Sequence, residues 1–221
     1  RLALITFADA VRRAHQAMLA QGAAPEFAKA VVTYFGLAVD ELARFTAVLN
    51  PWKVDAEAIV HVFGRQALPM LWDYCENVPL GSQGGTWEHR LSELAEVVGK
   101  LPTAPTVATA HHGTATALPW PEDTFDAVLT DPPYYDNVPY ADLSDFFYVW
   151  LKRTLGDLYP DLFATPLTPK SEEMVADAIR QGGKESARSF FEQMLTQAFR
   201  EIHRVLKPEG VAVIVFAHKT T

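Results

Sequence analysis

The sequence is poor in the residues that build disulfide frameworks, thiolate metal centres and membrane anchors. Cys75 is the single cysteine among 221 residues, which excludes a disulfide within the chain and a zinc site built from several of its thiolates. Apolar runs such as Val211 to Ala217 are far shorter than the roughly 20 residues that a transmembrane helix needs. Asp9 interrupts the N-terminal stretch that could imitate a signal peptide. We therefore expect a soluble globular protein of the cytoplasm without a membrane partner.

Basic charge is scarce as well. Lys and Arg number 19 against 27 Asp and Glu, a formal net charge of −8, whereas a self-sufficient DNA-binding domain usually carries a basic stripe. Residues 122–145 contain seven acidic residues and no Lys or Arg. This stretch should not face a phosphate backbone directly. Any nucleic-acid partner would therefore need local basic patches or a further subunit.

Helical periodicity dominates the first hundred residues. Apolar residues recur at spacings of three and four over 6–19, 25–49 and 87–98. Residues 56–78 hold further apolar clusters that prolines divide, so short helices are expected there. We therefore expect residues 1–100 to form a helical region whose first two helices make a hairpin.

Strand patterns follow in the second half of the chain. Strands are expected over 106–109, 125–130 and 211–216. The last run is rich in β-branched residues, which is typical of a strand buried on both faces of a parallel sheet. Three strands leave a sheet with open edges, which other chain segments could complete, the helices of residues 1–100 could cover, or a homo-oligomer could protect. The hypothesis for the isolated chain is association through such an edge or through its helical face.

The segments between these strands predict helices. They are expected over 142–155, in a short stretch before Gly182 and over 184–206, and residues 207–210 are expected to turn the chain. A strand, helices and a second strand in this order describe a right-handed crossover in an α/β sheet. We therefore expect residues 101–221 to form a partial α/β domain.

Asp131-Pro132-Pro133-Tyr134 follows the expected strand 125–130 directly. Ligands of open α/β sheets bind beyond the carboxyl ends of the strands. The two prolines lack N–H groups, so their carbonyls can accept hydrogen bonds without competing donors, and the Asp131 carboxylate adds a further acceptor. Tyr134 offers a flat face to an aromatic ring. The motif predicts a site for an amino group on a planar base; the alternative is a proline turn that caps the strand, with Asp131 bonded to nearby N–H groups.

The string Asp131-Pro132-Pro133-Tyr134 resembles the catalytic motif of amino-group methyltransferases that act on adenine N6 or cytosine N4 in DNA. The longer strings 126–153 and 63–80 are similar to a subfamily described as adenine-specific DNA methylases containing a zinc ribbon, and 207–210 looks like the turn before a strand of the methyltransferase fold. The resemblance implies a Rossmann-like methyltransferase sheet, DNA as partner and S-adenosylmethionine as cofactor. It implies methylation of an exocyclic amine, with adenine N6 as the first choice.

The resemblance also implies roles for single residues. The target base is flipped out of the stack, its amine bonds to the Asp131 carboxylate and the Pro132 carbonyl, and Tyr134 stacks on the ring. Four residues beyond the motif follow closely enough to line the base pocket or the loop over it, although a solvated loop explains them equally well: Tyr135, Asp136, Asn137 and Tyr140.

The sequence departs from the family pattern where the cofactor should bind. No glycine-rich turn follows a strand, and Gly36 and Gly64 lie in helical patterns. Gly113 and Thr114 align with a Gly-Asp pair of the family, in which the acid helps to hold the cofactor together with Asp131. Thr114 can still bond to an adenine amine, but with less charge assistance.

Three other expectations follow from these departures. His111 and His112 lack a third ligand at a recognisable spacing, so no metal site is expected. The chain looks like an internal piece of a larger protein, in which remaining segments or a partner subunit complete the site. The alternatives to DNA methylation are a non-catalytic or decayed methylase that keeps the fold, and a methyltransferase for RNA bases or protein amides.

Overall fold

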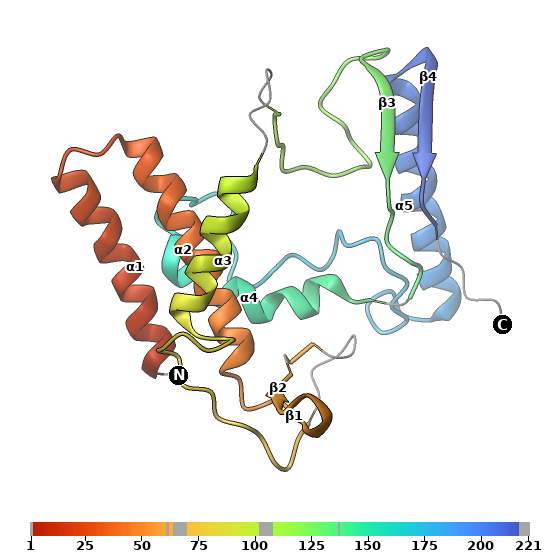
Figure 1. Cartoon of the computed structure of the whole chain (residues 1–221). Helices are drawn as coiled ribbons and strands as arrows, with labels where there is room; N and C mark the ends of the chain where they lie inside the picture. The colour runs from red at the N-terminus through yellow and green to blue at the C-terminus, as the bar shows by residue number, and fades with distance from the viewer. Residues whose placement is uncertain (1, 61, 64–69, 102–107, 137, 217–221) are drawn as a thin grey trace. The chain divides into compact units, whose positions relative to one another are not determined.

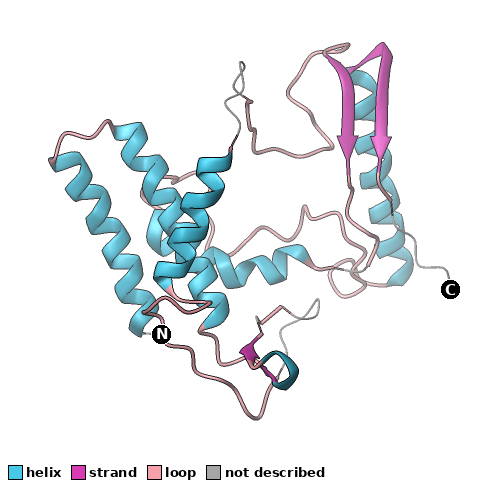
Figure 2. Ribbon diagram, in the orientation of Figure 1, coloured by secondary structure: helices cyan, strands magenta, loops and turns pink. Residues whose placement is uncertain are grey.

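The computed structural model describes residues 2–60, 62–63, 70–101, 108–136 and 138–216 (Figures 1 and 2). The chain forms two compact units. One unit comprises Arg1–Thr103 and Ala141–Pro169, and the other comprises Ala104–Tyr140 and Lys170–Thr221. The sequence predicts a division into residues 1–100 and 101–221. The two units differ from it chiefly because the segment Ala141–Pro169 belongs to the unit of the N-terminal helices.

Four helices account for most of the first unit, and each confirms a helix predicted from the apolar spacing. They are α1 (Leu2–Ala20), α2 (Pro25–Phe45), α3 (Trp87–Lys100) and α4 (Tyr140–Leu155), the last of which begins at the boundary of the unit. Gly22 has a φ of +85° in the turn after α1, a conformation that glycine adopts at little cost. Pro25 occupies the first turn of α2, where its fixed φ suits the helix. The predicted hairpin of α1 and α2 is confirmed (Figure 1).

The core of this unit gathers side chains from all four helices. Val11, Val32, Val39 and Leu155 are buried together. Trp87 at the start of α3 lies with its ring 5.0 Å from that of Phe7 on α1, measured between centroids. Burial of such aliphatic and aromatic surface is the main stabilising contribution to a helical unit of this size.

Gly36 on α2 lies against Leu155, the last residue of α4. A Cβ atom added to Gly36 would lie 2.7 Å from Cδ1 of the buried Leu155. We expect Gly36→Ala to destabilise the protein by about 1–3 kcal/mol, because the added methyl overfills the contact despite the better helix propensity of alanine. Urea unfolding of Gly36→Ala, Leu155→Ala and the double variant measures this, and the double variant should lose less stability than the sum of the two single ones. Additive losses would show that the two residues do not compete for space.

The predicted short helices of residues 56–78 are wrong for the described part of that segment. The chain instead forms the two-residue strands β1 (Trp52–Lys53) and β2 (Ala58–Ile59), with a 3-10 turn, η1 (Val54–Ala56), between them, and residues 70–80 are bends and irregular chain. The physical reason is Asn50, whose buried amide donates to the Arg44 and Val60 carbonyls, both at 2.8 Å, and closes a loop. Residues 61 and 64–69 lie outside the described residues.

The second unit is a small α/β arrangement. The strands β3 (Phe125–Thr130) and β4 (Leu206–Ile214) pair in parallel, and α5 (Lys184–Val205) lies behind them in Figure 1. The predicted strand 125–130 and the long helix are confirmed. The α/β class is therefore observed as a two-stranded parallel sheet with a helix on one face, and a Rossmann-like sheet stays a prediction.

Residues 207–210, expected to lead the chain into the last strand, lie within the bounds of β4 but have no paired partner in β3, because the register passes from Phe125 and Leu206 directly to Ala127 and Val211. The expected burial of β4 on both faces is wrong, since Val211 is 58% exposed and the described residues place one helix on this sheet of two strands.

The remaining strand prediction is not observed. Ala108 and Thr109 are irregular, and residues 106–107 lie outside the described residues. A strand at this position would need a pairing partner. Among the described residues, β3 pairs with β4 and β1 pairs with β2, and neither pair includes residues 108–109.

Candidate functional site

Asp131 lies directly after β3, at the carboxyl end of the parallel pair, where the sequence predicts it. Its side chain is exposed, whereas Pro132 is buried and anchors the loop beneath it. Pro133 and Tyr134 are half-buried. The fixed φ of consecutive prolines limits the conformations of this loop, so the carboxylate is presented to solvent on a stiff support.

Tyr134 is bonded to the carboxylate that precedes it. Its hydroxyl donates to Asp131 Oδ1 at 2.9 Å, and its ring meets the Phe216 ring edge-on at 6.3 Å between centroids. The hydrogen bond to the anionic carboxylate raises the pKa of the Tyr134 phenol, and Tyr140 adds a smaller electrostatic effect in the same direction. One phenol donor uses one of about four acceptor positions of a carboxylate, so Asp131 retains capacity for a ligand amine.

We expect Asp131→Asn to lower the pKa of Tyr134 towards its ordinary value, because the neutral amide removes both the hydrogen bond to a charged acceptor and the nearby negative charge. Ultraviolet difference titration of the phenols, with Tyr134→Phe used to assign the signal, measures the change. A Tyr134 titration that is the same in both proteins would show that the phenol does not bond to Asp131 in solution.

Tyr135 connects the loop to the rest of the unit. Its ring contacts that of Phe191 on α5 edge-on at 5.3 Å, and its carbonyl accepts from the Ala176 amide at 2.8 Å. The side chain therefore faces α5, and its expected place in the base pocket stays a prediction. The effect of both contacts is to fix the backbone immediately beyond Tyr134.

The partner of Tyr135 is a folded loop, residues 170–183, that the sequence pattern did not reveal. Arg180 organises it by bonding to Glu173 at 2.6 Å and to Asp177 at 3.2 Å. The short helix predicted before Gly182 is wrong, because these residues form turns. Acidic residues three and seven positions before Arg180 have the spacing of a helix face, but here they bond to Arg180 across a loop. Gly182 and Gly183, with φ of +75° and +144°, end this loop.

The other residues expected in the base pocket are only partly placed. Asp136 is exposed, and Tyr140, at the first position of α4, is 49% exposed. Tyr140 lies close enough to Tyr134 to affect its pKa. Asn137 lies outside the described residues. The structure thus gathers Asp131, Tyr134 and Tyr140 at one end of the sheet.

Thr114 lies in a turn that is fixed to the far half of α5. The Thr114 hydroxyl pairs with that of Thr116 at 2.8 Å. Further along the same loop, the Leu118 amide donates to Glu201 at 2.8 Å. Arg204 and the Leu118 amide lower the pKa of Glu201 to about 2.

This anchorage separates Thr114 from the Asp131 loop along α5. Glu201 is ten residues beyond Phe191, the residue that Tyr135 contacts, and a helix rises 1.5 Å per residue, so the two anchor points are about 15 Å apart. Gly113 and Thr114 are exposed. No hydrogen bond or ring contact recorded among the described residues joins them to Asp131.

The described residues do not fit S-adenosylmethionine. Gly113 lies in open space, since a Cβ atom added there would meet no other protein atom within 4 Å. The described strands are followed by Val54, Val60, Asp131 and Val215 and not by a glycine-rich turn. A cofactor site would need groups that these residues do not supply.

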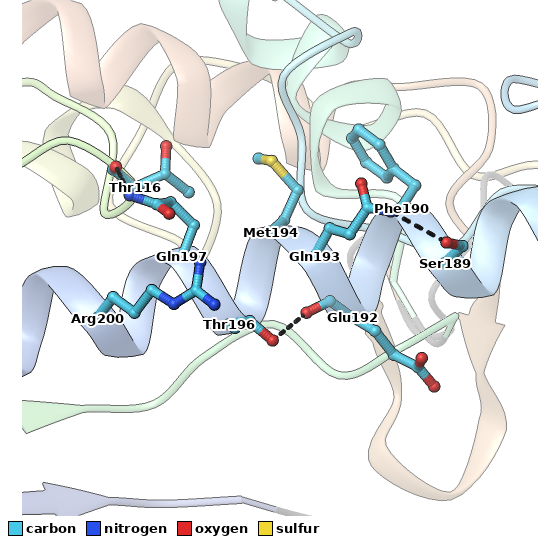
Figure 3. A pocket seen from close by; sticks show the side chains of 9 residues that line it. All are labelled: Thr116, Ser189, Phe190, Glu192, Gln193, Met194, Thr196, Gln197 and Arg200. Carbon is cyan, nitrogen blue, oxygen red and sulfur yellow. Dashed lines mark hydrogen bonds between the residues drawn. The ribbon is translucent and has the colours of Figure 1, made fainter.

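A pocket of about 590 Å³ lies along α5 and is distinct from the Asp131 loop (Figure 3). Gln193 donates to Ser189 at 3.1 Å along its wall, and Gln197 reaches the Thr116 carbonyl at 3.4 Å. None of the described residues between Asp131 and Tyr140 contributes to its lining, which consists of Thr116, Ser189, Phe190, Glu192, Gln193, Met194, Thr196, Gln197 and Arg200.

The described residues show neither a metal-binding cluster nor a membrane-spanning helix. No group of three or more His, Cys, Asp or Glu in them is placed to hold a metal ion, and the His111 ring lies edge-on to Trp120 at 5.2 Å. None of their helices has the length and apolar character to span a membrane.

Comparison of the chain with protein-family models, curated proteins and solved structures finds no match.

Proposed function

We propose that this chain carries the base-binding part of an amino-group methyltransferase, which acts on the exocyclic amine of a DNA base and on adenine N6 first. The observation that supports this proposal is the exposed Asp131 carboxylate at the carboxyl end of β3, bonded to Tyr134 and followed by two prolines. This combination presents hydrogen-bond acceptors beside an aromatic ring. A planar base with an amino group has the complementary chemistry.

The two hydrogens of the amine would bond to separate acceptors. One would go to the Asp131 carboxylate and the other to the Pro132 carbonyl, which has no N–H of its own to compete. Acceptors on both hydrogens favour a pyramidal nitrogen, whose lone pair is then less delocalised into the ring. S-adenosylmethionine would supply the methyl group when bound, at groups beyond the described residues. The part that this chain's residues play is to bind and orient the amine.

Base flipping reconciles the acidic surface with a DNA substrate. Asp126, Asp131 and Asp136 are exposed around the strand and its loop, so a duplex backbone would be repelled there. A base extruded from the stack reaches the loop without bringing its phosphates to the same place. The remaining segments of a longer chain or a partner subunit would then supply the basic contacts to DNA.

A second candidate function is a non-catalytic piece that keeps a base pocket but binds no cofactor. The observation that favours it is the place of Thr114, which is bonded to Thr116 on a loop fixed to Glu201 and separated from Asp131 along α5. The two candidates share the Asp131 pocket and differ in the cofactor. No observation favours an RNA base or a protein amide over DNA.

Calorimetric titration of S-adenosylmethionine into the 221-residue chain separates the two candidates. We expect no binding tighter than millimolar by the wild-type chain, and none by Thr114→Asp, because a single carboxylate cannot replace a cradle of several groups. The chain would then be a base-binding part that needs other residues. Micromolar binding would contradict this expectation and make methyl-transfer assays on single-stranded and duplex DNA the next step.

A further inference from the structure

The helix α5 lies on one face of the β3–β4 sheet, and the described residues place no helix on the other, which we call the open face. α5 lies behind the strands in Figure 1, and Phe191 and Val205 of this helix are buried. Residues paired in a parallel ladder point to the same side of the sheet, so Ala127 lies beside Val211 and Leu129 beside Val213. On the α5 side, Val128 and Thr130 are partly covered, but their partners on β4, Ala212 and Ile214, are exposed. Leu129, on the opposite side, is 73% exposed.

The open face is apolar along its whole length. It consists of Ala127, Leu129, Val211, Val213 and Val215, the last of which continues the ladder by donating its amide to the Thr130 carbonyl at 2.9 Å. Val211, Val213 and Val215 are 58%, 44% and 55% exposed. Parallel sheets occur almost only with helices on both faces, because strands of this composition lose stability in contact with water. A helix on the open face would remove these apolar side chains from water.

The charged residues in and beside the two strands indicate which charge a helix on the open face would need. Residues 122–131 and 206–216 contain Glu122, Asp123, Asp126, Asp131 and Glu209 against one basic residue, Lys207, which gives a net charge of −4 for the two segments. Lys207 is already paired with Asp126 at 2.6 Å. A second copy of this chain would bring like charges together, which is unfavourable at an apolar contact. A helix with Lys or Arg beside its apolar stripe complements both features.

We propose that the open face of the β3–β4 sheet binds a partner protein through an amphipathic helix whose apolar stripe is bordered by Lys and Arg. The stripe covers Leu129, Val211, Val213 and Val215, and the basic residues approach the carboxylates at the ends of β3. The apolar stripe contains no residue of the Asp131 loop, although the Asp131 carboxylate is one of the charges at its border, and the proposal does not depend on methyl transfer.

Two synthetic peptides test the proposal with the 221-residue chain. Both are helical, about 20 residues long, with the same Leu and Ala stripe, but one has Lys and the other Glu along its borders. Fluorescence anisotropy is expected to show micromolar binding of the Lys peptide, at least tenfold weaker binding of the Glu peptide, and a loss of that difference at high salt. Equal binding of the two peptides, or no binding of the Lys peptide, would overturn the proposal.

A matched pair of variants locates the contact. Leu129→Asp is expected to weaken binding of the Lys peptide at least tenfold, whereas Ile179→Asp, which makes the same change at a side chain 94% exposed in the 170–183 loop, leaves it unchanged. Methyl shifts of Leu129 and the three valines on adding the peptide to the wild-type chain give a second readout that needs no variant. Equal weakening by both variants, or no methyl shifts, would overturn the proposal.

Two further outcomes would identify a different occupant. Sedimentation of the free chain as a dimer that Leu129→Asp dissociates would assign the face to a second copy. A melting temperature much lower for Leu129→Asp than for Ile179→Asp would show that the chain itself already covers the face. Either result would overturn the proposal of a basic partner helix.

Discussion

Asp131→Ala is expected to abolish methyl transfer by the complete enzyme, with a fall of at least 10²–10³-fold in turnover, because removal of one positioned hydrogen-bonding group at a reacting centre typically costs that much. In the 221-residue chain the same change should weaken adenosine binding by about 10–100-fold, since a hydrogen bond to a charged group contributes about 1.5–3 kcal/mol. The melting temperature should hardly change, because the Asp131 side chain is exposed. Transfer assays, titrations followed by chemical shift, and thermal melts measure the three effects.

Asp161→Ala is the matched control for this experiment. Asp161 is an exposed carboxylate after α4 and belongs to the other unit, so its removal changes the net charge equally without touching the loop. Transfer and adenosine binding should stay at the wild-type level in this variant. Full turnover by Asp131→Ala would show that the proposed pocket is wrong.

Asp40→Asn should stabilise the protein at neutral pH and remove much of its pH dependence. Asp40 is 6% exposed on α2, and its Oδ1 has no hydrogen-bond partner among the described residues. Burial, together with the charge of Glu41, raises its pKa to about 8. At pH 7 the carboxyl must therefore take up a proton on folding, which costs about 4 kcal/mol relative to an unfolded chain with the ordinary value.

The sign follows from proton uptake. The folded protein binds more protons than the unfolded chain between pH 4 and pH 8, so its free energy of unfolding falls as the pH rises through this range and levels off above it. Asp40→Asn should gain about 2–4 kcal/mol at pH 7 and nothing at pH 3.5. Urea unfolding across this range measures it, with Asp9→Asn as the exposed control on α1. A gain that is equal at pH 3.5 and pH 7 would mean that Asp40 does not titrate with folding.

The sequence was most informative where a local pattern decides the structure. The spacing of Val11, Val32 and Val39 marks helix faces that become the core of the first unit. The strand 125–130 and the long helix before β4 were predicted for the same reason, since each carries enough periodic residues to outweigh its neighbours. The place of Asp131 followed from the strand that precedes it. These features needed no knowledge of distant residues.

Features that depend on distant residues could not be predicted. The hydrogen bonds from Asn50 replace the expected helices after residue 50 with two short strands, and an amide gives no periodic signal. The bond from Tyr134 to Asp131 and the Arg180 loop depend on side-chain geometry. Burial of β4 was expected from its composition, but burial depends on what covers a strand, and α5 covers one face only.

The hydrogen bond from Tyr134 to Asp131 has a consequence for the recognition of deaminated bases. Because the phenol proton points at the carboxylate, the pair presents lone pairs and no donor to a ligand. In the proposed base site an amine would find two acceptors, whereas a base whose amine has been replaced by a carbonyl, such as hypoxanthine or uracil, would bring oxygen to oxygen. We therefore expect the proposed site to disfavour the keto form by leaving its oxygen unpaired, which costs more than a merely missing contact.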